Sequence, residues 1–493
     1  MLRDPRDIDV LVIGGGPAGA TAAGLLASWG RSVVLAHRES GLPSLAESLP
    51  ASTKKLLRFL GQIDAVEAAR FHPNFGNRSR WAGKTAVATS ADPGYHVPRR
   101  DFDRRLREHA RAQGATILDG QVQRIDVGES PRIQVARAKG DVVAYSAAFV
   151  LDCSGRAGVV ARRGLRRAHV GYRTLAVAAE WECRDWPEEE RAHTLVDSYA
   201  DGWAWSVPLS PTRRQCTVMI DRDRTTIRKA SLAAVYRAEL HKATSIGERL
   251  DGARQSGQPW ACDASLYSAV RAADGRTLLV GDAASFIEPL SSAGVKKALT
   301  SAWRAAVVAN TCLEKPHMLH AASDFYDRRE QQVYHECLHR SAAFFKEAAT
   351  VHDNAFWTAR ASCCPEPGLD AASGLSDHDL RGDASIRHAF ERLRDTLALD
   401  LTPAPDLRFD MAAVIEGREV IMREAVMFPG LESPVRFAAG VNLPELVRLS
   451  TSCRDVASLI DAYHADVGQV DIDDLLLGLS LLIARGVVRD HVP

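Results

Sequence analysis

The sequence has 493 residues, and its 62 Lys+Arg balance its 62 Asp+Glu, so the formal net charge is zero. At about 150 residues per domain, the length predicts about three domains, or one large α/β domain with attachments. The apolar share of 46% and the charged share of 25% are ordinary globular values, which exclude a disordered chain, a collagen and a coiled coil. The zero net charge argues against a nucleic-acid partner.

Nine cysteines are scattered along the chain without a CxxC pair. Such a set predicts no disulfide framework and no zinc site, but mostly buried thiols in a reducing cytoplasm. The sequence has no run of eighteen apolar residues, and charged residues crowd positions 3 to 9. We therefore expect a cytoplasmic protein with neither a membrane span nor a signal peptide.

The N-terminus has the pattern of a dinucleotide-binding turn. Residues 8–13 (IDVLVI) predict a buried strand, and Gly14, Gly16 and Gly19 follow in the GxGxxG spacing. A small-residue helix and a second strand, SVVLA, come next. The first glycine allows a tight turn, the second admits a pyrophosphate, and the third lets helix and strand pack closely. The chain is therefore expected to have a Rossmann-like α/β fold.

The second strand usually ends in an acid that binds a ribose hydroxyl, and here His37 stands at that place. A neutral imidazole can still accept a hydrogen bond through one nitrogen. Glu39 is a nearby substitute, so the ribose contact stays open between these two residues.

Three further segments follow in a familiar order. Residues 96–115 predict a basic amphipathic helix, 150–158 (VLDCSGRAG) a strand with an acid and a glycine turn, and 275–299 a strand, the pair Gly281-Asp282 and a helix. Together they resemble the flavoprotein monooxygenases of the aromatic hydroxylase type, which bind FAD. The resemblance implies that Asp282 bonds the ribityl chain of FAD, and the simpler alternative for this residue is a helix N-cap.

The rest of the chain divides by composition. We expect an FAD-binding domain from 1–167 and 271–320, a substrate-side β-sheet domain at 168–270, and a helical segment with a linker at 321–405. Within that segment, 363–379 is loop-like and LTPAP at 401–405 is the linker.

A small C-terminal domain is expected at 406–493. Its pattern is a hairpin turning at Glu416-Gly417 and then three short helices, with Ser452 and Asp455 in a capping box. Asp471 is a cap for the third helix, and Gly486 ends it. This tail resembles the winged-helix peptide-binding modules attached to enzymes that modify ribosomally made peptides. It carries 14 Asp+Glu and 8 Lys+Arg, a charge of −6, which suits contact with a basic protein surface better than DNA.

A second signature, GWAWSVP, contains Trp203, Trp205 and Pro208. It resembles the WxWxxP pattern of flavin-dependent halogenases, in which the tryptophans separate flavin from substrate; the alternative is two tryptophans packed in a core. The segment 46–61 is also similar to that group, with its Glu-Ser pair at Glu47 and Ser48. The resemblance implies the following FAD contacts: Gly14, Gly16, Ala18, Gly19, His37, Glu47, Ser48, Arg100, Gly281, Asp282, Pro289 and Gly294.

The lysine that carries hypohalous acid in halogenases is missing from its expected segment. In FHPNFGNRSRWAG, Pro73 or Asn74 holds the matching place before Trp81, and Lys84 lies beyond it. A halogenase-like body without this lysine resembles the flavoproteins that hydroxylate tryptophan within a peptide or protein, as in tryptophylquinone maturation. Hydroxylation needs FAD, oxygen and an electron-rich ring that attacks the distal oxygen of the flavin C4a-hydroperoxide. We expect a substrate pocket with five residues: Asn74, Trp81, Trp203, Trp205 and Pro208.

A base must remove the ring proton, and the candidates are Glu47, His72 and Glu288, with Glu47 preferred. The sequence thus predicts an FAD-dependent monooxygenase that hydroxylates an aromatic side chain, with tryptophan the expected one, in a peptide or protein. Electrons would come from a flavin reductase or from NAD(P)H. The alternatives are a halogenase of an aromatic substrate, a flavin-bound protein that binds a precursor, and a prenyl-chain reductase.

Overall fold

The computed structural model describes residues 6–39, 41, 43–183, 186–225, 227, 230–362, 377–395, 398–429, 431 and 433–491. The chain forms two compact units, Met1–Cys364 and Pro365–Pro493. Each unit is considered by itself below. Most of the loop predicted at 363–379 lies outside the described residues.

The first unit contains a seven-stranded sheet with the order β1-β2-β6-β7-β8-β17-β16 and a further pairing of β1 with β8. Its centre is parallel, because β1 pairs in parallel with both β2 and β8. The strands are β1 (Asp7–Ile13), β2 (Val33–His37), β6 (Thr116–Asp126), β7 (Arg132–Arg137), β8 (Val142–Asp152), β16 (Ala273–Asp274) and β17 (Thr277–Leu279). The two predicted N-terminal strands are thus confirmed as central strands of a parallel sheet.

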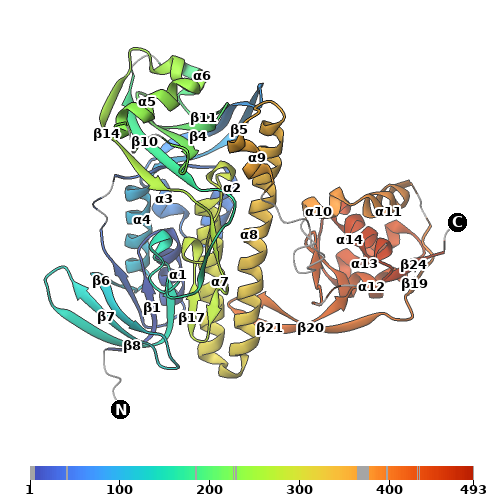
Figure 1. Ribbon diagram of the computed structural model, residues 1–493. Coiled ribbons are helices and arrows are strands. Elements are labelled where there is room, and N and C mark those ends of the chain that lie inside the picture. The colour runs from blue at the N-terminus through green and yellow to red at the C-terminus, as the bar shows by residue number, and fades with distance from the viewer. Residues whose placement is uncertain are drawn as a thin grey trace. The chain divides into compact units, whose positions relative to one another are not determined.

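Helices α1 (Pro17–Ser28), α4 (Arg99–Ala112) and α7 (Gly294–Glu314) pack together beside this sheet (Figure 1). Helix α1 begins after Gly16 with a proline in its first turn, a position where the missing N–H costs nothing. In α4, Asp101 lies in the first turn and His109 and Arg111 in the last, which complements the helix dipole. The basic helix predicted over 96–115 is confirmed.

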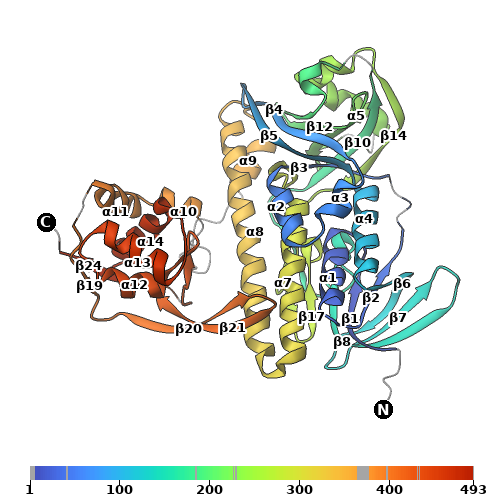
Figure 2. The ribbon, with the colours of Figure 1, turned by 180° about the vertical axis from the view of Figure 1, so that it is seen from behind.

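The long helix α8 (Leu319–Ala349) packs along α7, and α9 (Ala355–Ala361) packs against α8, as Figure 2 shows from behind. Two short helices, α2 (Ser52–Phe59) and α3 (Ile63–Glu67), complete this side. Among the described helices, none is long and apolar enough to cross a membrane.

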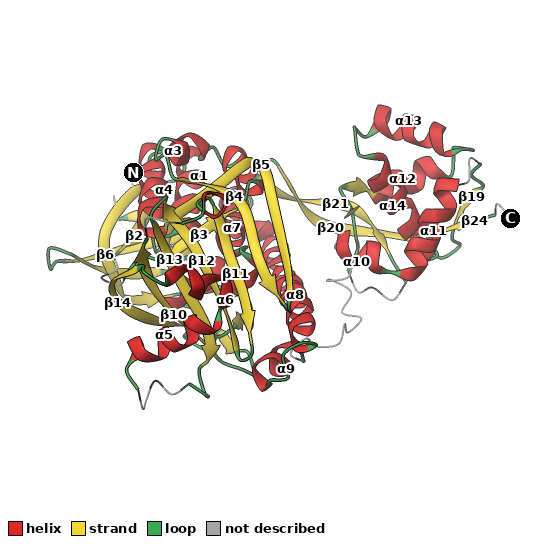
Figure 3. Ribbon diagram, turned by 90° about the horizontal axis from the view of Figure 1, so that it is seen from above, coloured by secondary structure: helices red, strands yellow, loops and turns green. Residues whose placement is uncertain are grey.

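An eight-stranded sheet with the order β14-β10-β13-β12-β11-β4-β5-β3 forms the other part of the first unit (Figure 3). The strands are β3 (Ala46–Leu49), β4 (His72–Trp81), β5 (Lys84–Pro98), β10 (Thr174–Glu182), β11 (His193–Tyr199), β12 (Gly202–Ser210), β13 (Arg213–Asp221) and β14 (Arg254–Asp263). Helices α5 (Leu232–Lys242) and α6 (Thr244–Gly247) pack against it. Strands β3, β4 and β5 come from the segment assigned by sequence to the FAD-binding domain, so the chain enters this sheet before 168.

Three short strands form a small sheet that joins these two parts: β9 (Arg166–Ala168), β15 (Tyr267–Ala269) and β18 (Ser285–Phe286). Strand β15 lies in the middle and pairs antiparallel with both neighbours. This arrangement brings residues near 166, 267 and 286 together, although they are far apart in the sequence.

The C-terminal unit combines five helices with short strands. They are α10 (Asp377–Gly382), α11 (Ala384–Asp395), α12 (Leu443–Ser450), α13 (Val456–Asp466), α14 (Ile472–Ala484), β19 (Leu401–Pro403), β20 (Arg408–Glu416), β21 (Glu419–Met427), β22 (Phe437–Ala438), β23 (Val441–Asn442) and β24 (Val488–Asp490). The hairpin turns at Gly417 (φ 60°), as predicted. Asp455 and Asp471 accept the capping hydrogen bonds of α13 and α14, and Gly486 has a positive φ after α14.

The predicted boundary at 406 falls inside this unit. Helix α11 packs against α14, and its Ile386 and Leu393 are buried in the core of the unit. The predicted linker at 401–405 is wrong in part, because β19 pairs antiparallel with β24 over Leu401–Pro403. Periodicity alone did not show this pairing, since the two strands are separated by the whole of the unit.

A truncation tests the boundary. We expect a chain ending at residue 364 to remain folded and monodisperse, because it removes the whole second unit. A chain ending at 405 retains α11 without α14, which exposes Ile386, Ala389 and Leu393. Size-exclusion chromatography should show association of the longer truncation, and equal behaviour of the two chains would contradict this boundary.

Candidate active site

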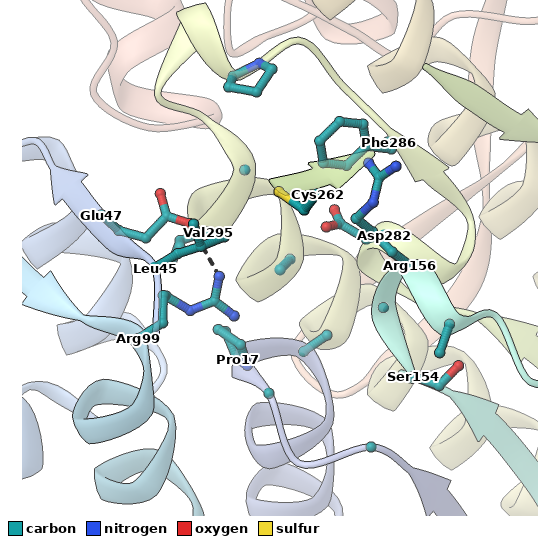
Figure 4. Close-up of a pocket in the computed structure, with 18 of the residues that line it drawn as sticks. Pro17, Leu45, Glu47, Arg99, Ser154, Arg156, Cys262, Asp282, Phe286 and Val295 are labelled. Carbon is teal, nitrogen blue, oxygen red and sulfur yellow. Dashed lines mark hydrogen bonds and ion pairs between the residues drawn. The ribbon is translucent and has the colours of Figure 1, made fainter. Parts of the chain in front are cut away.

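A cavity of about 560 Å³ runs through the first unit from the glycine turn after β1 to the tryptophans of β12. Figure 4 shows part of its lining. Eleven of the residues predicted from the sequence line it: Gly14, Gly16, Ala18, His37, Glu47, Ser48, Trp203, Trp205, Asp282, Pro289 and Gly294. The segments that carry the sequence motifs therefore meet around one space.

The glycine turn has the geometry that its motif predicts. Gly14 has φ +100°, and a Cβ there would lie 2.5 Å from the carbonyl oxygen of Cys153. A Cβ at Gly19 would lie 1.8 Å from the Gly14 oxygen, so Gly19 packs behind the turn and does not line the cavity. A Cβ at Gly16 would meet nothing closer than 3.7 Å. This open approach to the start of α1 suits a pyrophosphate.

His37 lines the cavity at the end of β2, and its ring contacts the carboxylate of Glu39. The Nε2 atom of His37 lies 3.3 Å from Oε1 of Glu39, which also accepts a 2.7 Å bond from Arg107. Arg107 in turn donates to the carbonyl oxygen of Gly15. Burial, and then the charge of Arg107, lower the pKa of His37. A neutral His37 is therefore the ring available for a ribose hydroxyl, with Glu39 behind it.

The turn at Gly281–Ala283 is held from several sides. The Gly281 N–H donates to Ser301 Oγ at 2.9 Å, and Lys297 Nζ donates to the carbonyl oxygens of Gly281 and Ser285. Tyr267 donates its hydroxyl to the carbonyl oxygen of Asp282 at 2.7 Å. Gly281 does not itself line the cavity, and its hydrogen bonds hold the turn in place.

The side chain of Asp282 lines the cavity and makes no hydrogen bond to any residue that the structure describes. It caps no helix, so the N-cap alternative is wrong. A carboxylate without a protein partner inside a cavity needs a donor from a bound molecule. A ribityl hydroxyl would satisfy it, and this is the observation of the structure that fits FAD.

Glu47 forms an ion pair with Arg99 across the opposite wall of the cavity (Figure 4). Arg99 Nη1 lies 3.1 Å from Glu47 Oε1, and Arg99 Nε lies 3.0 Å from Asp103 Oδ1. Burial raises the pKa of Glu47, and the charge of Arg99 opposes this rise. Glu47 is thus a stronger proton acceptor than an exposed carboxylate. Arg100 was predicted as a cofactor contact, but its neighbour Arg99 lines the cavity and Arg100 is not among the lining residues.

Asn74, which with Pro73 is one of the two residues expected at the place of the halogenase lysine, is buried and directed at Ser48. Its Nδ2 donates to Ser48 Oγ at 2.9 Å and to the Leu49 carbonyl oxygen at 3.0 Å. Thr194 also donates to Ser48 Oγ, at 2.8 Å. Because Ser48 accepts both bonds and lines the cavity, its own proton is free to point at a bound molecule. Asn74 itself does not line the cavity, which corrects its predicted place in the pocket.

Trp203 and Trp205 are stacked with their ring centroids 5.0 Å apart, and both line the cavity. Trp81 contacts Trp203 edge-on at 6.3 Å and Trp357 at 5.5 Å, and its indole donates to the Phe344 carbonyl oxygen. The pair therefore packs in a core, as one interpretation of the signature predicts, and it also lines the cavity; its role between flavin and substrate stays a prediction. Trp81 and Pro208 lie outside the lining.

Two of the three candidate bases lie outside the cavity lining. His72 is half-buried, and its Nε2 lies 2.6 Å from the Arg191 carbonyl oxygen. Glu288 is 2% exposed, and neither of its carboxylate oxygens has a partner among the described residues. Its neighbours Ile287 and Pro289 line the cavity, but Glu288 does not. Glu47 is the candidate base that the structure places in the cavity.

Among the residues that the structure describes, no lysine lines the cavity. Lys297 is turned toward backbone carbonyls, Lys54 forms an ion pair with Asp92, and Lys84 forms one with Glu347 on the exposed surface. Within the described part of the chain, no cluster of three or more His, Cys, Asp or Glu is arranged to hold a metal.

Comparison with known proteins decides the family. A family profile described as tryptophan halogenase matches residues 63–372. The chain belongs to this family. It is 31% identical over 384 residues to the tryptophan 2-halogenase of Chondromyces crocatus, covering 74% of this chain and 73% of that protein. The family is flavin-dependent, and FAD is its cofactor.

Two solved structures share the fold over almost the whole halogenase-family chain. CmlS, a flavin-dependent halogenase, superposes with a TM-score of 0.80 at 22% identity and covers 98% of this chain and 96% of its own. QhpG, a peptidyl tryptophan dihydroxylase essential for tryptophylquinone cofactor biogenesis, gives 0.70 at 22% identity and covers 97% and 99%. The predicted FAD-binding fold is confirmed.

Several side chains of the halogenase-family site were not found by sequence reasoning. Thr217 is the cross-strand partner of Trp205, and Thr194 reaches the site through β11. The pairing of the strands determines where both threonines lie, and a single sequence does not reveal that pairing. Arg156 is the exception, because it stands in the SGRAG turn of segment 150–158, which the sequence already assigns to the FAD-binding domain.

Glu288→Gln tests the buried carboxyl. Burial raises the pKa of Glu288 from 4.5 to about 7. The unfolded chain therefore ionises first, and the free energy of unfolding should fall as the pH rises between these two values. The variant should lose this pH dependence, worth up to ~3 kcal/mol above pH 7. Urea unfolding across this range measures it.

The matched control is Glu188→Gln, because Glu188 is exposed. Its effect on stability should stay within about 0.5 kcal/mol at every pH. If Glu288→Gln retains the pH dependence of the parent chain, Glu288 is not the group responsible for it.

Proposed function

We propose that the chain is an FAD-dependent monooxygenase that hydroxylates an aromatic side chain, tryptophan first, within a peptide or protein. The observation that carries the proposal is the cavity lining, in which no residue that the structure describes is a lysine. The expected lysine position of the halogenase pattern falls on Pro73 or Asn74, and the Asn74 amide is engaged with Ser48 and Leu49. An amide nitrogen bonded in this way is not a carrier for an electrophilic halogen.

The groups that face the cavity suit ring hydroxylation. FAD, when bound, supplies the activation of oxygen. Glu47 accepts the ring proton, and Arg99 fixes the position of its carboxylate. Trp203 and Trp205 form an apolar wall that keeps water from the reacting ring. One oxygen atom enters the ring, the other leaves as water, and two electrons come from a reductant.

Two features favour a peptide substrate and a separate reductant. QhpG, which shares the fold over nearly the whole chain, acts on a peptidyl tryptophan. Flavin-dependent halogenases need a flavin reductase, so a reductase is the first electron source to test and NAD(P)H the second. At 22% identity, the likeness to QhpG shows the fold alone. The proposed substrate class therefore rests on the residues of the cavity together with this shared fold.

Halogenation of an aromatic substrate is the second candidate. The tryptophan 2-halogenase relative at 31% identity favours it. The two candidates share the cavity, FAD and the base, and they differ in the need for halide and for a lysine. Lys84 is the lysine of the sequence segment concerned, but it is paired with Glu347 on the exposed surface.

The product test compares tryptophan-containing peptides incubated with the chain, FAD, a flavin reductase and oxygen. We expect the mass of one or more oxygen atoms to be added, with the same yield whether chloride and bromide are present or absent. A chlorine or bromine isotope pattern that disappears without halide would refute hydroxylation, and Lys84→Gln would then show whether Lys84 carries the halogen. Absence of any product, with slow reoxidation of the reduced flavin, would favour a precursor-binding protein.

Glu47→Gln tests the base. Removing a general base from the cavity should lower the hydroxylation rate by about 10²–10⁴-fold while FAD remains bound. His72→Gln is the control, because His72 does not line the cavity and should retain the parent rate. Similar rates for Glu47→Gln and the parent chain would exclude Glu47 as the base.

A further inference from the structure

Strand β5 leaves one of its two edges open over its first six residues. Figure 3 shows β5 at the side of the eight-stranded sheet, beside β4. Its last residues, 95–98, pair with β3, which occupies the outer edge there. Over 84–89, no strand of the described chain pairs with that edge, and each of these six residues is exposed. The edge that accepts β3 at one end is therefore free at the other.

The turn that joins β4 to β5 determines which main-chain groups point outward. Trp81 and Lys84 close a two-residue loop of Ala82 and Gly83, whose φ values are 50° and 74°. Two positive φ values are typical of a type I′ turn, in which the closing residues form a hydrogen-bonded pair. Because bonded and non-bonded pairs alternate along an antiparallel ladder, Thr85 is the first residue of β5 to face away from β4.

Three residues of β5 thus present their N–H and C=O groups at the open edge: Thr85, Val87 and Thr89. In the part of the chain that the structure describes, these main-chain groups have no partner outside the ladder. The Thr89 contact to His193 Nε2, at 3.4 Å, is made by its side chain. An unpaired edge can recruit a further strand, and proteins usually guard such an edge with charges or proline. Residues 85–91 (TAVATSA) contain neither.

The simplest alternative is an ordinary edge that faces only water. Exposure alone is consistent with that alternative, because water can satisfy main-chain groups. The charges at the two ends of the stretch are engaged elsewhere, however, since Lys84 pairs with Glu347 and Asp92 pairs with Lys54. They do not guard the residues between them, so this edge is open to a partner strand.

Two arginines of β4 give the open edge a charge preference. Arg80 lies directly opposite Thr85 and Arg78 opposite Val87, so these side chains project from the same face of the sheet. Neither arginine forms an ion pair with a residue that the structure describes. Asp197 is beside Arg80 in the ladder, but its carboxylate accepts from main-chain N–H groups of α6. An added strand would lie about 10 Å from β4, a span that an arginine and an acidic side chain cover together.

The open edge belongs to the same sheet as the wall of the cavity. Strand β3, which occupies the far end of this edge, carries Glu47 and Ser48 into the cavity. At the near end, Trp81 contacts Trp203 edge-on at 6.3 Å, and Trp203 lines the cavity. A peptide held at this edge would therefore be anchored to the body that contains the reaction site.

We propose that the open edge of β5, residues 84–89, binds an extended acidic segment of the peptide substrate as an additional strand. The main chain of β5 supplies the hydrogen bonds, and Arg78 and Arg80 select glutamate or aspartate at alternate positions. A second copy of this chain fits less well, because antiparallel self-pairing puts the arginines of both copies on one face. The role as a substrate contact rests on the proposed function, whereas the binding itself depends on neither reaction.

Val87→Pro tests the main-chain contact in the full, FAD-loaded chain. It removes the central outward N–H and leaves the β4–β5 ladder bonds in place. The matched control is Val87→Thr, which retains the N–H and a β-branched side chain. The probe is a fluorescein-labelled peptide of about eight residues that alternates glutamate with valine, a length that covers the open edge. Fluorescence anisotropy should show binding to the parent chain and the control, and binding about tenfold weaker to Val87→Pro. The fully N-methylated peptide should not bind.

The charge preference has its own variants. Arg78→Gln combined with Arg80→Gln should weaken binding of the acidic peptide about fivefold. The control is Arg132→Gln, because Arg132 is an exposed arginine on β7, a strand of the other sheet. A peptide with lysine in place of glutamate should bind the parent chain more weakly than the acidic peptide does.

Three results would overturn the proposal: parent-like binding by Val87→Pro, equal binding of the N-methylated peptide, or no binding by the parent chain. A parent dimer that Val87→Pro dissociates, seen by analytical ultracentrifugation without peptide, would assign the edge to a second copy and overturn it as well. Failure of the proposed function is distinguishable, because a tryptophan-containing acidic peptide would then bind at the edge and gain no oxygen. If Val87→Pro does not fold, the N-methylated peptide still provides the test.

Discussion

The turn at Gly281–Ala283 is the constraint on which the site depends. Its amide, carbonyls and neighbouring residues are fixed by Ser301 and Lys297 from α7 and by Tyr267 from β15. Ser301 is fixed in turn by Glu330 of α8, at 3.0 Å. The backbone therefore has no freedom at this point, and the Asp282 side chain remains available to the cavity. Two helices and a small sheet thus direct one carboxylate into the cavity.

The surroundings of Asn74 bear on which reaction the cavity suits. A lysine at position 74 would put a cationic amine where the Asn74 amide now donates to Ser48 and to the Leu49 carbonyl oxygen. Thr194 donates to the same Ser48 hydroxyl. The amide fits because it donates twice and its own oxygen accepts from the Gly76 N–H. The polar network at this wall is complete without a halogen carrier. Hydroxylation needs no such carrier, so the same cavity suits it.

The sequence predicted local features well and tertiary ones poorly. The glycine turn, the basic helix α4 and the hairpin at Gly417 each follow from contiguous residues, and each is found as expected. Arg99 rather than Arg100 faces the cavity because the first turn of α4 sets the direction of both side chains. The orientation of Glu288 and the pairing of β19 with β24 depend on contacts made by distant segments. No local pattern encodes such contacts.

The zero net charge also has a local explanation. It sums a C-terminal tail at −6 and a remainder at +6, and much of that positive charge lies in one stretch, 153–179, which contains six arginines and no Asp or Glu. A nucleic-acid-binding protein would display such arginines on an open face with long-range reach. Here two of them, Arg156 and Arg166, are instead withdrawn against the rings of Phe286 and Tyr267, with nitrogen atoms that are buried. Placement, rather than total charge, therefore determines what this basic stretch can reach.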